Sequence, residues 1–221
     1  MTWPPFFPTF DQLSPSVAIF PLTGVLLLPR GQLPLNIFEP RYIALVDDAL
    51  ASDRLIGMIQ PVAGAGDRGT PEVYPMGCAG RITSFDETDD GRYLITLTGL
   101  CRFHLVEELE TTRGYRRVVA DWSPFRDDME AAAEDLGLDR DRLGQALAAY
   151  FERQGIKANW DAIDDTPDDR LVTSLAMICP FSPCEKQALL QAPSRPERAE
   201  LLLSLIEMAA LDNEGSDTPR H

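Results

Sequence analysis

The chain has 221 residues, of which 44% are hydrophobic and 25% charged, an ordinary globular composition that argues against a disordered or fibrous protein. Lys and Arg number 20 against 35 Asp and Glu, which gives a formal net charge of −15. Binding to nucleic acid or to an anionic membrane requires a cationic surface, so this charge disfavours both as main partners.

The first residues contain neither a basic segment nor an uninterrupted apolar run, so they do not resemble a signal peptide. No stretch approaches the roughly 20 apolar residues of a membrane-spanning helix. The four cysteines, at positions 78, 101, 179 and 184, are too few for a disulfide scaffold at this length. We therefore expect a cytoplasmic protein with reduced thiols.

Aromatic and proline residues crowd residues 1–15. Trp3, Phe6, Phe7 and Phe10 are interrupted by three prolines, which prevent an α-helix and favour an extended chain. Four large aromatic side chains in an exposed segment would be an apolar liability. Two interpretations follow: the segment is a strap across the protein's own surface, or it is a motif that docks into a partner or a second copy.

Residues 16–125 consist mainly of short apolar runs that are separated by Pro and Gly and therefore favour strands. The runs lie at residues 17–22, 25–28, 33–38, 55–62, 78–85, 93–106 and 115–122. The Asp-Asp-Gly at 89–91 indicates a hairpin between two of them. One helix is expected at 40–51, because Pro40 suits a first turn and apolar residues recur behind it at helical spacing.

Side chains along residues 93–106 alternate between two faces, as in a strand. One face is apolar: Tyr93, Ile95, Leu97, Cys101, Phe103 and Leu105. The other face is mixed: Leu94, Thr96, Thr98, Arg102 and His104. This alternation predicts one buried face, as in a small barrel.

Helical periodicity begins at residue 139, after an acidic stretch at 126–138 that we interpret as a linker. Gly155 ends the first helix, and two capping boxes start later ones, Ser182 with Glu185 and Ser194 with Glu197. Residues 139–211 are therefore expected to form a helical bundle, followed by a polar tail at 212–221. A β-rich half before a helical half predicts an α+β fold.

Motifs that could carry chemistry are weak. The G-x-G-x-x-G at 64–69 is followed by prolines at 71 and 75, so the helix that would hold a phosphate cannot open there, and we interpret it as a surface loop. The histidines are His104 and His221, so a nucleophilic triad or dyad would have to use His104, which we interpret as a half-exposed strand residue.

A metal site is not expected either. Cys179 and Cys184 have C-x₄-C spacing but no second ligand pair, so we interpret them as two apolar thiols beside a turn between helices. The acidic pairs at 127–128 and 164–165 lack the alternation of a calcium loop and are expected to be solvated linkers or helix starts. We predict no catalytic residues, no metal and no cofactor.

Several segments resemble the N-terminal domain of Lon proteases. They are Ile-Phe-Pro-Leu at 19–22, Leu-Pro-Arg-Gly at 28–31, Leu-Pro-Leu-Asn-Ile-Phe-Glu-Pro-Arg-Tyr at 33–42, Gly-Leu-Cys-Arg-Phe at 99–103 and Glu-Lys-Gln-Ala-Leu-Leu at 185–190. The resemblance spans about residues 16 to 210. Asn36 stands where the family usually has His, which indicates that this position is not an indispensable ligand or base. The ATPase and Ser-Lys peptidase domains of a full Lon protease have no counterpart here, so the chain is similar to the stand-alone members.

The resemblance implies a PUA-like β-barrel at 16–125 followed by the helical bundle, and recognition of protein or peptide without catalysis. Within its most specific block, Phe38, Glu39, Pro40, Arg41 and Tyr42, we expect structural roles. Phe38 would plug the barrel, Glu39 would cap the following helix, and Arg41 would pair with a carboxylate.

The leading hypothesis is a non-enzymatic module that binds protein or peptide segments as an adaptor to an ATP-dependent protease or chaperone in protein quality control. An alternative is a small-molecule enzyme or ligand binder that uses the barrel mouth. An RNA-binding PUA-like module is a third hypothesis, which the charge of −15 disfavours. The sequence leaves the partner and the oligomeric state open.

Overall fold

The computed structural model describes residues 4, 6–62, 71–130 and 136–211. Its strands, in chain order, are β1 (Ser16–Pro21), β2 (Gln32–Ile37), β3 (Leu55–Ile59), β4 (Met76–Glu87), β5 (Tyr93–Leu109) and β6 (Arg116–Asp121). Its α-helices are α1 (Pro40–Leu50), α2 (Arg140–Gln154), α3 (Trp160–Asp164), α4 (Asp168–Ile178), α5 (Pro183–Gln191) and α6 (Arg195–Leu211). Short 3₁₀ segments are η1 (Phe10–Gln12) and η2 (Ser123–Met129). The predicted α+β fold is confirmed.

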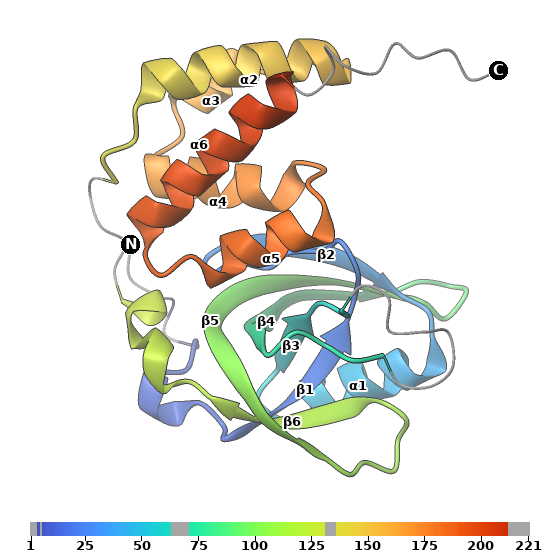
Figure 1. Cartoon of the computed structure of the whole chain (residues 1–221). Coiled ribbons are helices and arrows are strands. Elements are labelled where there is room, and N and C mark those ends of the chain that lie inside the picture. Colours follow the sequence, from blue (N-terminus) through green and yellow to red (C-terminus); the bar gives the residue numbers. More distant parts are fainter. Residues whose placement is uncertain (1–3, 5, 63–70, 131–135, 212–221) are drawn as a thin grey trace, which may run out of the picture. The chain divides into compact units, whose positions relative to one another are not determined.

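The strands form a sheet in the order β2-β5-β4-β3-β1-β6, and β6 also pairs with β5, so the sheet closes into a barrel (Figure 1). β1 and β3 are parallel, and the other pairs are antiparallel. Along the edge opposite β4, the long β5 pairs with two strands in turn, since residues 93–98 pair with β2 and residues 104–109 pair with β6. β2 is therefore an edge strand that lies outside the closed ring.

Phe103 fills the centre of the barrel and is fully buried. Its ring packs against two glycines, since a Cβ added to Gly57 or Gly77 would lie 3.0 or 2.7 Å from its Cζ. The ring of Trp122 meets it edge-on at 5.5 Å between centroids. Glycine on the neighbouring strands is what makes room for an aromatic ring inside so narrow a barrel.

Residues 25–28, which the sequence predicts as a strand, form a buried loop instead. Leu26, Leu27 and Leu28 are at most 2% exposed. The loop passes against Gly80 and Gly99, where an added Cβ would lie 2.7 Å from Leu27 Cδ2 and 2.0 Å from the Leu28 carbonyl oxygen, respectively. A short buried apolar run has the same pattern whether it pairs in a sheet or packs as a loop, which explains the wrong prediction.

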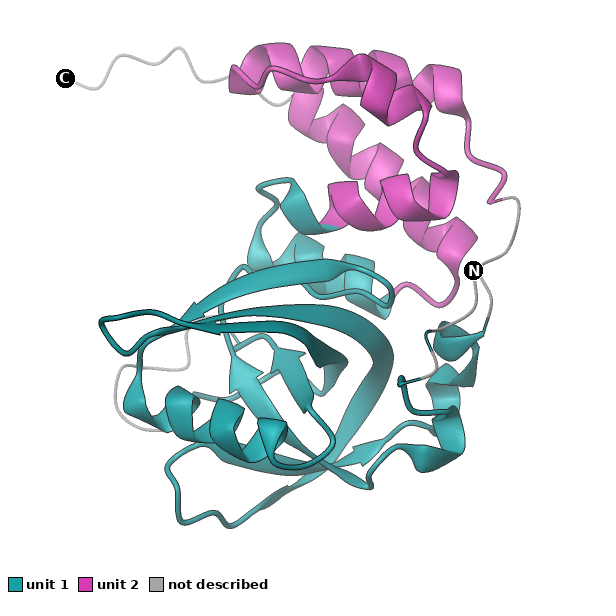
Figure 2. Cartoon of the chain, turned by 180° about the vertical axis from the view of Figure 1, so that it is seen from behind, with its two compact units in different colours: residues 1–132, 177–191 teal, residues 133–176, 192–221 magenta. Residues whose placement is uncertain are grey.

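The chain divides into two compact units, shown in different colours in Figure 2. Unit 1 comprises residues 1–132 and 177–191, and therefore includes the barrel, α1, η1, η2 and α5. Unit 2 comprises residues 133–176 and 192–221, in which the exposed ion pair of Arg142 and Glu207 joins α2 to α6. The sequence groups residues 139–211 into one bundle, whereas the contacts group α5 with the barrel.

The helix boundaries follow the local signals. Gly155 ends α2 in the left-handed conformation, at φ 63°. The Ser182 hydroxyl accepts from the Glu185 amide at 3.3 Å, and the Glu185 carboxylate accepts from the Ser182 amide at 2.7 Å, which completes the predicted capping box of α5. The short helix α3 lacks a long apolar stripe and was not predicted.

Replacing Gly99 by alanine tests the close approach of the 25–28 loop. Gly99→Ala places a methyl group onto the Leu28 backbone, which cannot rotate away, so we expect a loss of about 1–3 kcal/mol or more in the free energy of unfolding. The control is Gly144→Ala in α2, where an added Cβ meets nothing within 4 Å. That variant should gain about 0.5–1 kcal/mol from helix propensity. Equal behaviour of the two variants in urea unfolding would contradict the packing described.

Candidate functional site

Phe38 does not plug the barrel, contrary to the sequence-based expectation. Its side chain is 66% exposed, and the fully buried Phe103 occupies the barrel centre instead. β2 ends at Ile37, so Phe38 lies beyond the last paired residue, at the turn into α1. The Phe38 ring is therefore part of the protein surface and not of the barrel core.

The rest of the Glu-Pro-Arg-Tyr block fixes α1. Glu39 is the N-cap residue by its backbone, but its carboxylate makes no cap hydrogen bond and accepts from Arg41 Nε at 2.9 Å. Pro40 starts the helix, as expected. Tyr42 is buried against Phe20 of β1, with 4.0 Å between ring centroids. The expected pairing of Arg41 with a carboxylate is thus present, and the side-chain cap by Glu39 is not.

The N-terminal aromatic residues differ in exposure. Phe7 is buried and Phe6 is 63% exposed, while Trp3 lies outside the described residues. The guanidinium of Arg126 lies 4.0 Å from the Phe10 ring centroid and also pairs with Asp11 at 3.0 Å.

The segment that follows is not extended throughout. Residues 10–12 form the 3₁₀ turn η1, where the Thr9 amide donates to Gln12 Oε1 at 2.9 Å and the Gln12 amide donates to the Thr9 carbonyl at 3.0 Å. Beyond it, the indole Nε1 of Trp122 donates to the Ser14 carbonyl at 2.8 Å. These contacts hold residues 7–14 on unit 1, an arrangement that favours the strap interpretation.

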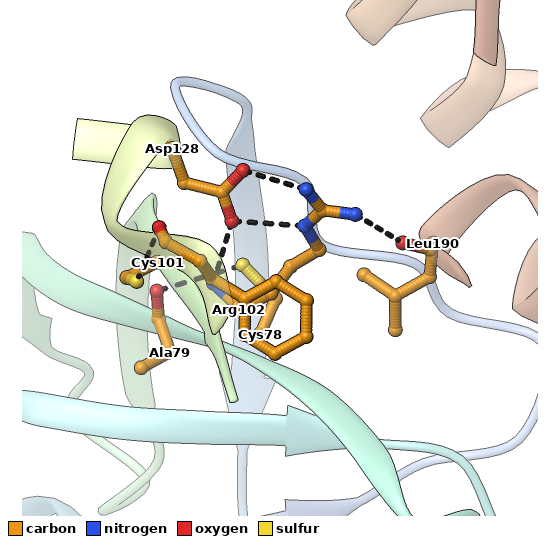
Figure 3. A network of polar contacts seen from close by, with 7 residues as sticks. Cys78, Ala79, Cys101, Arg102, Asp128 and Leu190 are labelled. Carbon is orange, nitrogen blue, oxygen red and sulfur yellow. Dashed lines mark hydrogen bonds and ion pairs between the residues drawn. The ribbon is translucent and has the colours of Figure 1, made fainter. Parts of the chain in front are cut away.

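Arg102 is the centre of a buried polar cluster around β5 (Figure 3). Its Nε and Nη2 donate to the two carboxylate oxygens of Asp128 at 2.9 Å each, and its own amide donates to Oδ2 at 3.0 Å. Nη1 donates to the Leu190 carbonyl of α5 at 3.2 Å. The guanidinium also lies 4.8 Å from the Phe125 ring centroid. One side chain therefore joins β5, η2 and α5.

This cluster corrects one expectation from the sequence. Asp128 was expected to be a solvated linker residue, yet it is 5% exposed and lies within η2, inside the stretch interpreted as a linker. Residues 131–135 of that stretch lie outside the described residues. A buried guanidinium requires a compensating carboxylate, and the sequence shows neither how deeply Arg102 is buried nor which acid reaches it.

α5 is held to the barrel by two further buried polar side chains. Lys186 Nζ donates to the carbonyls of Gly24 at 2.9 Å and Met177 at 3.3 Å, and burial lowers the pKa of this ammonium group. Gln187 Nε2 donates to the Met76 carbonyl at 3.3 Å, and its Oε1 accepts from Gln60 at 3.3 Å. The capping box predicted the helix, but no local signal showed that its polar residues face inward.

A shallow open hollow of about 370 Å³ lies on the outer face of the sheet where β2, β5 and β4 run side by side. It is lined by Pro34, Leu35, Asn36, Ser84, Asp86, Leu94, Ile95 and Thr96. The register places six of these residues on one face in two rows, Asn36, Leu94 and Asp86 in one and Pro34, Thr96 and Ser84 in the other, and the paired Leu35 and Ile95 lie between the rows. Side chains at such positions share one face of the sheet.

Polar groups in this hollow are available to a ligand. Within the described residues, the side chains of Asn36, Ser84, Asp86 and Thr96 make no hydrogen bond or ion pair with the protein. Leu94, between Asn36 and Asp86, is 42% exposed. Apolar surface beside uncommitted donors and acceptors is typical of a binding site.

The other candidates from the sequence are one histidine and two cysteines in the described residues, together with two features outside them. His104 is half-buried, with its ring 5.1 Å from that of Phe125. Cys179 is buried, while Cys184 is exposed beside the Tyr74 hydroxyl at 3.7 Å. Over residues 4, 6–62, 71–130 and 136–211, no group of three or more His, Cys, Asp or Glu side chains is arranged to hold a metal ion. The glycine motif at 64–69 and His221 lie outside the described residues.

The sequence of the chain matches the model of the ATP-dependent protease La (LON) substrate-binding domain over residues 16–208. The chain belongs to the LON substrate-binding domain family. Of the helices in the described part of the chain, none has both the length and the apolar character of a membrane span.

Relatives of this LON domain include Lon protease 2 of Myxococcus xanthus and a Lon protease of Anaeromyxobacter dehalogenans (strain 2CP-C), each 26% identical over 92% of the chain. The chain spans only 25% and 24% of these two proteins. Among solved structures, a Lon N-terminal domain protein from Xanthomonas campestris is 26% identical, with a TM-score of 0.60 over 86% of this chain and 97% of that one. The N-terminal domain of a Mycobacterium avium complex Lon protease has the same fold, with a TM-score of 0.62 at 20% identity over 90% and 99% of the two chains.

Removing Asp128 from this LON domain tests the polar cluster. Asp128→Ala leaves the Arg102 guanidinium buried without its carboxylate, so we expect the free energy of unfolding to fall by about 3–5 kcal/mol. A double variant, Arg102→Met with Asp128→Leu, should recover much of that loss because neither charge remains buried. Glu39→Gln removes an exposed partner of Arg41 and serves as the control with little change. A stable Asp128→Ala variant would contradict the role of the pair.

The strap interpretation is tested with adjacent phenylalanines. Phe7→Ala should lower the free energy of unfolding by about 1.5–3 kcal/mol, because it removes a buried aromatic side chain. Phe6→Ala, at the exposed neighbour, should leave stability unchanged. If instead Phe6→Ala abolishes dimerisation or partner binding, and Phe7→Ala leaves stability intact, the segment is a docking motif. Thermal unfolding and analytical ultracentrifugation distinguish the two.

Proposed function

We propose that this LON substrate-binding domain holds segments of unfolded polypeptide without cleaving them. As an adaptor in the cytoplasm, it presents them to an ATP-dependent protease or chaperone. The family match over residues 16–208 carries the proposal, since it covers most of the chain. The hollow on β2, β5 and β4 supports it, because polar side chains without partners among the described residues surround an exposed leucine there.

A small-molecule site in the barrel mouth is the alternative from the sequence, and the packing weighs against it. Leu27 and Leu28 are 1% and 0% exposed where the 25–28 loop packs on Gly80 and Gly99, and Phe103 fills the centre. The described interior is therefore occupied by the protein's own side chains, and the outer surface is the better place for a partner.

Binding to an unfolded client tests the proposal. Reduced and carbamidomethylated lysozyme, which keeps the positive charge of native lysozyme but not its fold, should bind the purified chain in a fluorescence anisotropy titration. Native lysozyme is the matched control and should not bind. The client should stay intact in the mixture, with or without ATP.

The adaptor role is tested by adding the same client to a bacterial extract, with and without the purified chain. The chain should accelerate degradation of the client only when ATP is present. Equal binding of native and unfolded lysozyme would contradict recognition of unfolded polypeptide, and cleavage of the client by the purified chain would contradict the non-enzymatic role.

A further inference from the structure

We propose that the hollow on β2, β5 and β4 binds a client segment that carries a lysine or arginine next to apolar residues. This inference rests on the proposed function and deepens it, because it assigns the site and the chemical class of the segment. The apolar side chains of the client would cover Leu94 and Pro34, and its cationic group would pair with Asp86.

The geometry of the hollow provides an apolar surface beside one carboxylate. Leu94 lies opposite Asn36 on β2 and opposite Asp86 on β4, so the three side chains form one row across the strands. In the next row, Thr96 lies opposite Pro34 and Ser84. A volume of about 370 Å³ accommodates one large side chain and part of its neighbours.

The negative charge in and beside the hollow favours a positively charged group on the client. Asp86 makes no ion pair among the described residues, and the adjoining hairpin carries Glu87, Asp89 and Asp90 against a single cation, Arg92. Arg92 is already paired with Asp90. The chain as a whole carries a formal charge of −15. A lysine or arginine has an aliphatic stem for the apolar surface and a charged end for Asp86, so it matches both features of the hollow.

The hollow, and not the edge of β2, is the attachment point. The Gly99 amide donates to the Gly31 carbonyl at 2.8 Å, so alternation along the antiparallel pair directs the backbone groups of Leu33 and Leu35 toward β5. Those of Pro34 and Asn36 face the open edge, where Pro34 has no N–H to donate. A proline at the middle of an edge strand opposes strand addition, so the client is held through its side chains.

Two neighbouring acidic residues on β4 make a matched pair for the test. Asp86→Asn removes the charge that lines the hollow, and Glu87→Gln removes the same charge one residue away, on the opposite face of the strand. The probes are short labelled peptides with Leu-Lys-Leu, Leu-Gln-Leu or Leu-Glu-Leu at the centre, titrated against the full chain by fluorescence anisotropy. Thermal unfolding of each variant verifies that the fold is retained.

We expect the Leu-Lys-Leu peptide to bind most tightly and Asp86→Asn to weaken it about two- to fivefold, as for a solvent-exposed ion pair. Added salt should weaken binding to the native chain more than binding to Asp86→Asn. Leu94→Ser should weaken all the peptides, and Glu87→Gln should leave them unchanged.

Three outcomes would overturn the inference. If Asp86→Asn and Glu87→Gln weaken binding equally, the attraction is a general effect of negative charge. If neither Asp86→Asn nor Leu94→Ser has an effect while peptides and unfolded lysozyme still bind, the proposed function stands and the site lies elsewhere. If no peptide and no unfolded client binds, the proposed function fails and the inference fails with it.

Discussion

A buried guanidinium is the constraint on which the arrangement of unit 1 depends. Arg102 is 7% exposed, and a charge at that depth is tolerated only when its hydrogen-bonding groups are satisfied. Asp128 and the Leu190 carbonyl satisfy them, and each comes from an element that has no backbone pairing with β5. The position of η2 and α5 on the barrel is thus set by the electrostatic requirement of one strand residue. Lys186 and Gln187 reinforce α5 in the same way, by donating to carbonyl groups of the barrel and its loops.

The same strand also carries the surface at which we propose that a client binds. β5 has 17 residues, and its middle is covered on the outside by η2 and α5 at Arg102. Its first part, which pairs with β2 and β4, keeps an open outer face with the exposed Leu94. One continuous strand is therefore anchored by polar contacts at Arg102 and remains accessible in its first part. A site built on paired strands is held more precisely than one built on a loop, which suits recognition by a few side chains.

The sequence predicted features that depend on neighbouring residues, such as strand alternation and helix ends. It did not predict contacts between residues that are far apart in the chain. The alternation of β5 predicted the buried Ile95, Leu97 and Phe103, and the capping boxes and Gly155 predicted helix ends. Arg102 meets Asp128 at a separation of 26 residues and Leu190 at 88, and no periodicity encodes such contacts. The role expected of Phe38 belongs to Phe103, because the sequence does not show where β2 leaves the sheet. The hollow requires the register of three strands, so its residues could not be grouped from sequence alone.

The return of α5 to the barrel has a consequence for biosynthesis. Unit 1 consists of residues 1–132 and 177–191. When the last barrel strand of a nascent chain has left the ribosome, the carbonyl of Leu190 and the side-chain amide of Gln187 have therefore not yet emerged. Most of the helices of unit 2 emerge before the barrel receives its last element. A barrel expressed alone, cut after residue 125, would lack Asp128 as well and would leave Arg102 buried with no counter-charge. Unit 1 can therefore be completed only after residues 133–176 of unit 2 have been synthesised.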